Sequence, residues 1–383
     1  MPLHFSESEL ASRRDAACTA LQREGLDGLL IFRQETMFYL TGYDTFGYVF
    51  FQCLYLGADG RYALMTRAPD LRQAQRTSCI EDIRIWVDGD AVNPADQLKE
   101  MLQDFGCANK TLGVEYEAYG LTGYNAKRLD AALEGYCKLR DASWLVSRLR
   151  VIKSPAEIAY VREAAKLADD AYHAGMAEIR AGAFEGEILA AMQGAVFKGG
   201  GDYPGNEFII GSGPEALLCR YFTGRRHLDP EDQLTLEWAG VYRRYHAAMM
   251  RTVAIGRAPA RQNELHAAAS EALQAVEARL SPGNSAGQAF AAHAEVLDKA
   301  GLQAHRLNAC GYSLGTTFAP NWMDWPMLYR DNPVEIAPGM VFFVHIIIFD
   351  SEQGVAMSLG RTFLVGESGA EILSAAPLDF LVM

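Results

Sequence analysis

The stretch RVIKSPAEI, from Arg150 to Ile158, decides how the chain is organised. The hydroxyl of Ser154 can accept hydrogen bonds from the free N–H groups at a helix start, and Pro155 suits the first helical position. Glu157 stands three residues after Ser154, where its carboxylate can return a hydrogen bond to the cap. The stretch therefore predicts that a long helix begins here and that a new domain begins with it.

The length of the chain also favours two domains, since 383 residues exceed the usual size of a single hydrophobic core. Before the boundary, an amphipathic pattern predicts a helix at 7–24, and apolar runs predict strands at 28–32 and 48–56. This alternation is typical of an α/β domain, which we expect at 1–147, and we expect an α+β domain at 148–383. The helices predicted in the second domain lie at 154–179, from 185 onward, at 262–280 and at 286–300, and its strands at 232–256, 339–349 and 356–366.

The composition excludes several classes of partner. The formal net charge is −13 and no run of Lys and Arg is present, which argues against nucleic acid. No apolar stretch reaches the roughly 18–20 residues that span a bilayer, and the first residues do not resemble a signal peptide. The seven cysteines are scattered without a CxxC pair, which favours a reducing compartment. We expect a cytoplasmic protein without membrane contact.

Five short motifs, in order, resemble the creatinase/aminopeptidase P superfamily (peptidase family M24, the pita-bread hydrolases). They are Arg150–Ile158, Gly201–Pro204, Ile210–Gly213, Gly311–Gly315 and Pro338–Phe342. Each motif alone is weak, but their common order is specific. The resemblance implies a creatinase-like α/β N-terminal domain followed by a catalytic pita-bread domain, and it covers essentially the whole chain.

Metal-dependent members of this superfamily hold two divalent ions with two Asp, one His and two Glu. The positions that correspond to these ligands in this chain are Glu237, Ala248, Tyr312, His345 and Gly360-Arg361. Two adjacent cations need several carboxylates to bridge and neutralise them, and Ala and Gly offer no donor atom. We therefore expect neither a two-metal centre nor any other cofactor. A single ion held by Glu237, His345 and His246 remains open as an alternative.

Two members of the superfamily, creatinase and ectoine hydrolase, work without metal, and the chain resembles ectoine hydrolase more closely. Met250 occupies the position of a creatinase glutamate, whereas Glu237, Arg244–Ala247, Gly311–Gly315 and Pro320–Trp322 match ectoine hydrolase. The resemblance implies metal-independent hydrolysis of an amide or amidine C–N bond in a small, amino-acid-like compound, linear or cyclic. Two alternatives remain: a metal-dependent Xaa-Pro peptidase with an altered site, and a catalytically inactive homologue that binds small molecules.

The catalytic residues that we expect are Glu237, His345, His246 and Tyr312. Glu237 is the candidate nucleophile or general base, and the two histidines are candidates for protonating the leaving nitrogen, because imidazole titrates near neutral pH. The Tyr312 phenol can donate a hydrogen bond to an oxyanion. Structural alternatives are an ion pair for Glu237, a backbone cap for His246, and packing for His345 and Tyr312.

Five further residues are expected at the substrate. Arg220 or Arg361 can hold a substrate carboxylate by a two-pronged contact, and Arg251 supports the site. Trp322 and Phe46 are expected to line the pocket. The resemblance to creatinase implies that Phe46 comes from the other subunit of a homodimer, whose N-terminal domain lies near its partner's active site.

Overall fold

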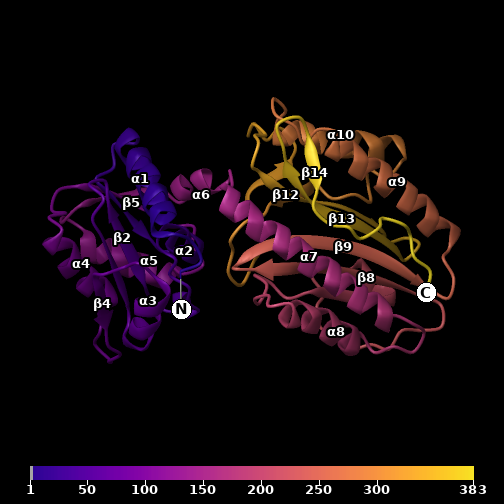
Figure 1. The fold of residues 1–383 in the computed structure, drawn as a ribbon, viewed down its shortest axis with the longest axis horizontal. Helices are drawn as coiled ribbons and strands as arrows, with labels where there is room; N and C mark the ends of the chain where they lie inside the picture. The colour runs from indigo at the N-terminus through magenta and orange to yellow at the C-terminus, as the bar shows by residue number, and fades with distance from the viewer. Residues whose placement is uncertain (1–2) are drawn as a thin grey trace. The chain divides into compact units, whose positions relative to one another are not determined.

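The computed structural model describes residues 3–383, which form two compact units that meet at Arg150 and Val151. The expected boundary, between residues 147 and 148, lies three residues earlier. The expected α/β and α+β characters of the two units are confirmed by the order of their helices and strands (Figure 1). No helix among the described residues is long and apolar enough to cross a membrane.

The N-terminal unit is a six-stranded mixed sheet in the order β4-β3-β2-β1-β5-β6. Leu29 and Ile31 of β1 face one hydrophobic cluster with α1, α2 and α6, while Leu30 faces a second cluster with α4 and α5. Alternate residues of a strand point to opposite faces, so helices cover both faces of this sheet. Its elements are α1 (Glu7–Arg23), β1 (Gly28–Ile31), α2 (Gln34–Thr41), β2 (Cys53–Gly57), β3 (Tyr62–Arg67), α3 (Leu71–Thr77), β4 (Ile83–Trp86), α4 (Pro94–Asp104), β5 (Thr111–Val114), α5 (Gly123–Leu133), β6 (Lys138–Asp141) and α6 (Leu145–Arg150).

One predicted strand is shorter than expected. The apolar run at 48–56 forms a strand only from Cys53, because Gly47–Val49 is a turn of 3-10 helix. The N–H of Gly47 bonds to Thr45 Oγ1, and the indole of Trp86 donates to the carbonyl of Phe51. These side-chain contacts take the place of strand pairing, and they leave Val49 and Phe50 exposed.

The C-terminal unit is an eight-stranded sheet in which β11-β10-β12-β13-β9-β8-β7 lie side by side and β14 pairs with β13. Its strands are β7 (Ile209–Ser212), β8 (Asp232–Tyr242), β9 (Tyr245–Ile255), β10 (Ala309–Ser313), β11 (Asp324–Tyr329), β12 (Val341–Asp350), β13 (Val355–Val365) and β14 (Ala370–Ile372). Its helices are α7 (Pro155–Glu178), α8 (Glu185–Lys198), α9 (Ala260–Glu277) and α10 (Ala286–Lys299). The predicted capping box of α7 is present, with Ser154 and Glu157 bonded to each other's backbone N–H.

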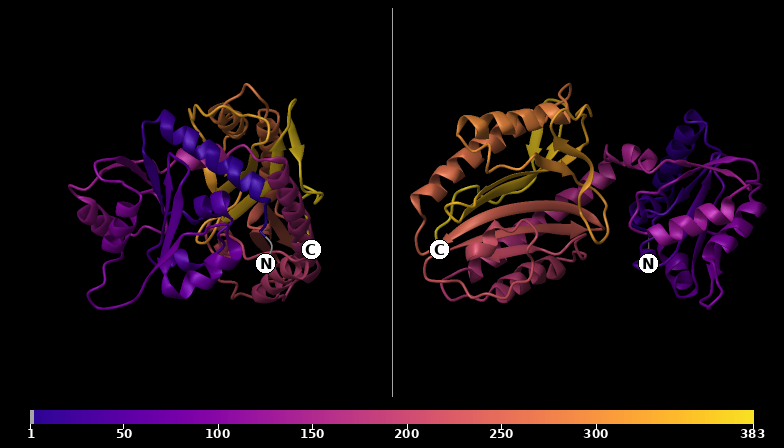
Figure 2. Two further views of the ribbon diagram at one scale, coloured as in Figure 1. Left: turned by 60° about the vertical axis from the view of Figure 1, so that its left-hand side comes forward. Right: turned by 180° about the vertical axis from the view of Figure 1, so that it is seen from behind.

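The long helices α7, α9 and α10 pack on one face of this sheet (Figures 1 and 2). Phe342, Val344 and Ile346 of β12 share a core with α9 and α10, and the indole of Trp238 on β8 donates to Ala168 of α7. At Gly240 a side chain would collide with the backbone of α7, so glycine permits this close approach. The odd-numbered residues of β8 and β12 therefore point to the opposite face.

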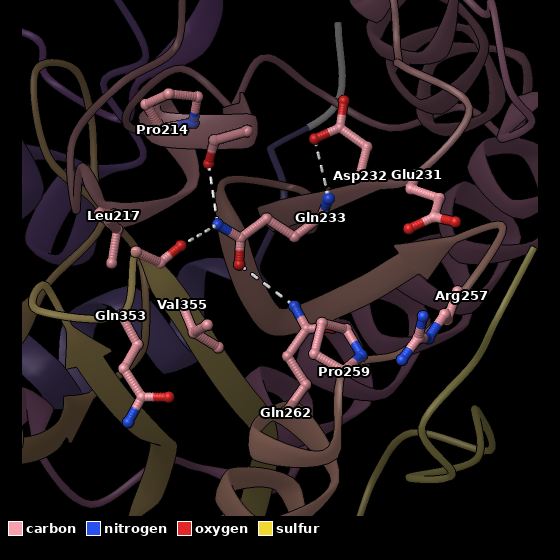
Figure 3. A pocket seen from close by; sticks show the side chains of 12 residues that line it. Pro214, Leu217, Glu231, Asp232, Gln233, Arg257, Pro259, Gln262, Gln353 and Val355 are labelled. Atoms are coloured by element: carbon pink, nitrogen blue, oxygen red, sulfur yellow. Dashed lines mark hydrogen bonds between the residues drawn. The ribbon is translucent and has the colours of Figure 1, made fainter.

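A cavity of about 590 Å³ lies at the start of β8 (Figure 3). Gln233 donates to the carbonyls of Gly213 and Gly354, and its own carbonyl accepts from the N–H of Ala356 and from Gln262. This network ties the turn between β12 and β13 to β8. Gln233 is four residues from Glu237, or about 13 Å along an extended strand.

Candidate active site

A row of paired residues crosses the middle of the C-terminal sheet. Glu237 on β8 pairs with Met250 on β9, and Met250 pairs with Gly360 on β13. Gly360 in turn pairs with His345 on β12. Because cross-strand partners point to the same face, Glu237 and His345 lie on the face opposite α7, α9 and α10.

Tyr312 and Trp322 complete a hydrogen-bonded chain to Glu237. Tyr312 on β10 pairs with Phe343 of β12, and its hydroxyl lies 3.3 Å from Glu237 Oε1. The indole N–H of Trp322 donates to the Tyr312 hydroxyl at 2.8 Å. Both aromatic side chains are buried, whereas Glu237 is partly accessible. The structure thus brings together three residues that the sequence placed at the site.

The surroundings of Glu237 change its acidity. Burial of the carboxyl raises the pKa of Glu237 to about 7, although the hydrogen bond from Tyr312 and the charge of Arg220 act in the opposite direction. Burial and the charge of Glu237 raise the pKa of the Tyr312 phenol well above its usual range, so this side chain is protonated at neutral pH. A carboxyl group with a pKa near 7 can both accept and release a proton at physiological pH.

Arg220 supplies positive charge to this site. It lies in the loop between Leu217 and β8, and its side chain is exposed. Its positive charge acts to lower the pKa of both Glu237 and His345. Its neighbour Cys219 was not singled out from the sequence; burial and then the charge of Glu237 raise the pKa of its thiol to about 11.

His246 is fully buried and engaged at both ring nitrogens. Nε2 accepts the N–H of Gly205 at 2.9 Å, so the ring proton is on Nδ1, which lies 3.2 Å from Thr317 Oγ1. Burial lowers the pKa of His246 to about 4. The neutral ring therefore joins three segments around the site, and this geometry does not provide a proton for a leaving group.

His345 lies on the same face as Glu237, with its ring 5.6 Å from the ring of Tyr312. Burial, followed by the charge of Arg220, lowers the pKa of His345 to about 4. Its buried Nδ1 has no hydrogen-bond partner among residues 3–383. At neutral pH this imidazole is neutral as well.

Arg251 and Arg361 lie on the other face of the sheet, which corrects the expectation that Arg361 can hold a substrate carboxylate; Arg251 was expected to support the site. Each immediately follows a member of the central row, Met250 or Gly360, so the alternation of the strand turns its side chain away. The Arg251 guanidinium donates to the carbonyls of Met250, Gly360 and Pro377, and Arg361 donates to the carbonyl of Ala376. Both arginines therefore hold backbone segments behind the site.

Phe46 belongs to the N-terminal unit, where its ring is 69% exposed. It contacts Tyr48 edge to face, with the ring centroids 5.9 Å apart. An aromatic ring of this size on the surface is available for contact with a ligand or another chain.

The residues at the expected metal positions do not fit a two-metal centre. Ala248 and Gly360 carry no donor atoms, and Tyr312 is protonated at neutral pH. Within residues 3–383 no three His, Cys, Asp or Glu side chains come close enough together to hold an ion. Hard divalent cations in pairs require bridging carboxylates, and Glu237 is the single carboxylate of the central row.

His293 on α10 is a buried histidine that the motifs did not single out. The stripe of α10 that packs into the core includes Ala289, Phe290, His293, Ala294 and Leu297. Burial and the charges of Arg306 and His345 lower the pKa of His293 to about 3. The spacing of three and four residues along this stripe was the signal that could have identified it.

Comparisons with known proteins agree with this architecture. Residues 159–367 match the model of metallopeptidase family M24, and residues 13–152 match that of the creatinase/prolidase N-terminal domain. Ectoine hydrolase from Halomonas elongata is 29% identical over 99% of this chain and 98% of its own length. A Xaa-Pro dipeptidase from Pyrococcus furiosus is 22% identical over 75% of this chain and 78% of its own length.

Solved structures show the same fold. A prolidase from Thermococcus sibiricus superposes with a TM-score of 0.87 at 18% identity, covering 97% of this chain and 98% of its own. An X-Pro aminopeptidase from Thermotoga maritima gives a TM-score of 0.84 at 21% identity, covering 97% and 99% of the two chains. These similarities confirm the expected pairing of a creatinase-like N-terminal domain with a pita-bread domain.

Proposed function

Because the chain belongs to metallopeptidase family M24, we propose that it is a hydrolase that cleaves a C–N bond in a small, amino-acid-like compound, linear or cyclic, without bound metal. The observation that carries this proposal is the position of Glu237, a lone carboxyl group in the central row, 3.3 Å from the Tyr312 hydroxyl, where burial raises its pKa to about 7. The similarity to ectoine hydrolase over the whole chain supports the same class of reaction.

Glu237 can perform the proton transfers of such a hydrolysis. As a general base it takes a proton from water while the water oxygen bonds to the sp² carbon of an amide or amidine. The C–N bond then breaks, and the nitrogen leaves with the proton that Glu237 returns. In the alternative route the Glu237 carboxylate attacks the carbon directly, and the C–N bond breaks as the leaving nitrogen takes a proton from water. The hydroxide formed then adds to the carbonyl of the acyl-enzyme, which releases the product acid and the Glu237 carboxylate. Both routes use the same carboxylate.

The histidines have other tasks in this scheme. His246 and His345 are neutral at pH 7, because burial lowers the pKa of each to about 4. A neutral imidazole is a weak acid, so we assign protonation of the leaving nitrogen to Glu237. His246 instead holds the site's loops in place, and His345 forms part of the wall next to Tyr312.

Arg220 is the proposed anchor for a substrate carboxylate. It is exposed on a loop, and its charge acts on Glu237 and His345. A guanidinium can bind a carboxylate through two parallel hydrogen bonds, which would orient the scissile bond over Glu237. We further propose a cytoplasmic homodimer in which Phe46 of one subunit lines the site of the other.

Xaa-Pro dipeptidase activity is the second candidate, supported by the relative from Pyrococcus furiosus. That branch of the family requires metal-binding side chains at the positions of Ala248 and Gly360, and neither of these residues has a donor atom. Incubation with ectoine, N-acetylated amino acids and a Xaa-Pro dipeptide, followed by mass spectrometry, separates the candidates. We expect hydrolysis of a compound of the first two classes without added metal. Hydrolysis of the dipeptide alone, and only with manganese or cobalt, would replace our proposal.

Glu237→Gln tests the assigned residue and the inactive alternative together. Loss of a general base or nucleophile lowers kcat by about 100-fold or more. Glu231→Gln is the matched control, since Glu231 is an exposed carboxylate that lines the cavity at the other end of β8. Equal turnover by the wild type and Glu237→Gln would rule out this role for Glu237.

A further inference from the structure

The chain of hydrogen bonds at Glu237 has a fixed direction. An indole N–H can only donate, whereas a phenol has one proton to donate and lone pairs to accept. Trp322 Nε1 lies 2.8 Å from the Tyr312 oxygen, so Tyr312 is the acceptor in that bond. The single proton of Tyr312 is then available for its other neighbour, Glu237 Oε1, at 3.3 Å.

We propose that Trp322 is a positioning residue: it directs the Tyr312 hydroxyl at Glu237 Oε1 and so leaves Oε2 as the oxygen that reacts. The reactive role of Glu237 rests on the proposed function, but the direction of these hydrogen bonds does not. Since Oε1 accepts a hydrogen bond, a proton on the neutral Glu237 carboxyl is carried by Oε2. Oε2 therefore exchanges protons with water or substrate.

This assignment changes the roles expected for both aromatic residues. Tyr312 has no second proton with which to stabilise an oxyanion while it is bonded to Glu237. The Trp322 side chain is 1% exposed and its polar edge is occupied by Tyr312, so it offers little surface to a substrate. Both residues act on the substrate through Glu237.

The indole is held in this orientation by the loop that His246 fixes. The backbone N–H of Trp322 donates to Asn206 Oδ1 at 3.3 Å, and the backbone of Gly205 packs so closely that a Cβ there would lie 3.0 Å from Trp322 Cα. The N–H of Gly205 in turn donates to His246 Nε2 at 2.9 Å. Gly205 thus permits the close approach to the backbone of Trp322, and His246 holds Gly205 in place.

The test is the indole N–H resonance of Trp322 in ¹⁵N–¹H spectra, since the chain has only five tryptophans. Trp322→Phe assigns the resonance by its disappearance, and if that variant does not fold, Trp→Phe changes at the other four positions assign it by elimination. We expect Glu237→Gln to move the Trp322 resonance more than the other four, because a carboxylate polarises the Tyr312 hydroxyl more strongly than an amide does. In the Tyr312→Phe background, Glu237→Gln should leave the resonance where it is.

Two results would overturn the proposal. In the first, Glu237→Gln does not change the chemical shift of the Trp322 indole; in the second, it changes that shift equally with and without the Tyr312 hydroxyl. Trp238→Phe is the matched control, because it removes an indole bond to Ala168 on the opposite face and should not move the Trp322 resonance. These spectra need no substrate, so a negative result for the positioning role of Trp322 can be told apart from a negative result for the proposed function. With a compound that is turned over, Trp322→Phe should lower kcat and not change KM, whereas a rise in KM alone would identify a substrate contact.

Discussion

Glu237 of β8 is paired directly with Met250 of β9, so the cross-strand neighbour of the Glu237 carboxyl group is a thioether. The next residue in the row, Gly360, has no side chain. The row contains no second carboxylate that could neutralise a divalent cation or bridge two of them. Glu237 therefore lies in an apolar setting, which raises the pKa of its carboxyl rather than preparing it for metal.

The first prediction concerns metal removal. Dialysis of the purified protein against a chelator should leave its melting temperature and its hydrolytic rate unchanged, because in the proposed mechanism no metal contributes to folding or to the reaction. Trace-metal analysis should find far less than one divalent ion per chain. A melting temperature that falls with chelation and recovers with manganese would show that the chain holds an ion after all.

The second prediction concerns stability and pH. The pKa of Glu237 is about 7 in the folded protein and about 4.5 unfolded, so the unfolded state releases this proton first as pH rises. Stability is therefore lost between about pH 4.5 and 7, by about 3 kcal/mol at most. Glu237→Gln should melt at a higher temperature than the wild type at pH 8 and at nearly the same temperature at pH 4.5. If the wild type and Glu237→Gln have the same melting temperature at both pH values, the pKa of Glu237 is not raised by folding.

The third prediction separates the arginines on the two faces of the sheet. Arg220→Gln should raise KM by about 10-fold or more, since a charged hydrogen-bonded contact contributes about 1.5–3 kcal/mol, with little change in stability. Arg251→Gln should instead lower the free energy of unfolding by about 2–4 kcal/mol, because it leaves the buried carbonyls of Met250 and Gly360, and the partly buried carbonyl of Pro377, without this donor. Kinetics and urea denaturation of both variants distinguish these outcomes. The reverse pattern would place Arg251 at the substrate.

The fourth prediction concerns His246 as a structural residue. His246→Ala should lower the free energy of unfolding by about 2–3 kcal/mol, because the buried N–H of Gly205 loses its acceptor and a cavity remains. His246→Gln can present a carbonyl to the same N–H and should recover part of this loss. If the alanine variant is as stable as the wild type but inactive, His246 acts in the chemistry instead.

Much of the architecture could be predicted from short sequence patterns. The capping box at Ser154, the paired strands within 232–256 and the two closing strands were each predicted from a few adjacent residues, because caps and alternation act over short distances. With the register of β13 known, the same alternation would have predicted that Arg361 points away from Glu237. Register is a property of two strands, so one strand's sequence did not contain it.

The amino-acid sequence by itself determined the two-domain organisation, the family and the donor-poor set at the metal positions, since each depends on residue identity and order along the chain. The tertiary structure alone decided which groups meet: the side chain of Trp322 with that of Tyr312, Tyr312 with Glu237, and the His246 ring with the backbone N–H of Gly205. It also decided the acidity of Glu237, because a pKa depends on solvent and charges brought close by folding from distant parts of the chain.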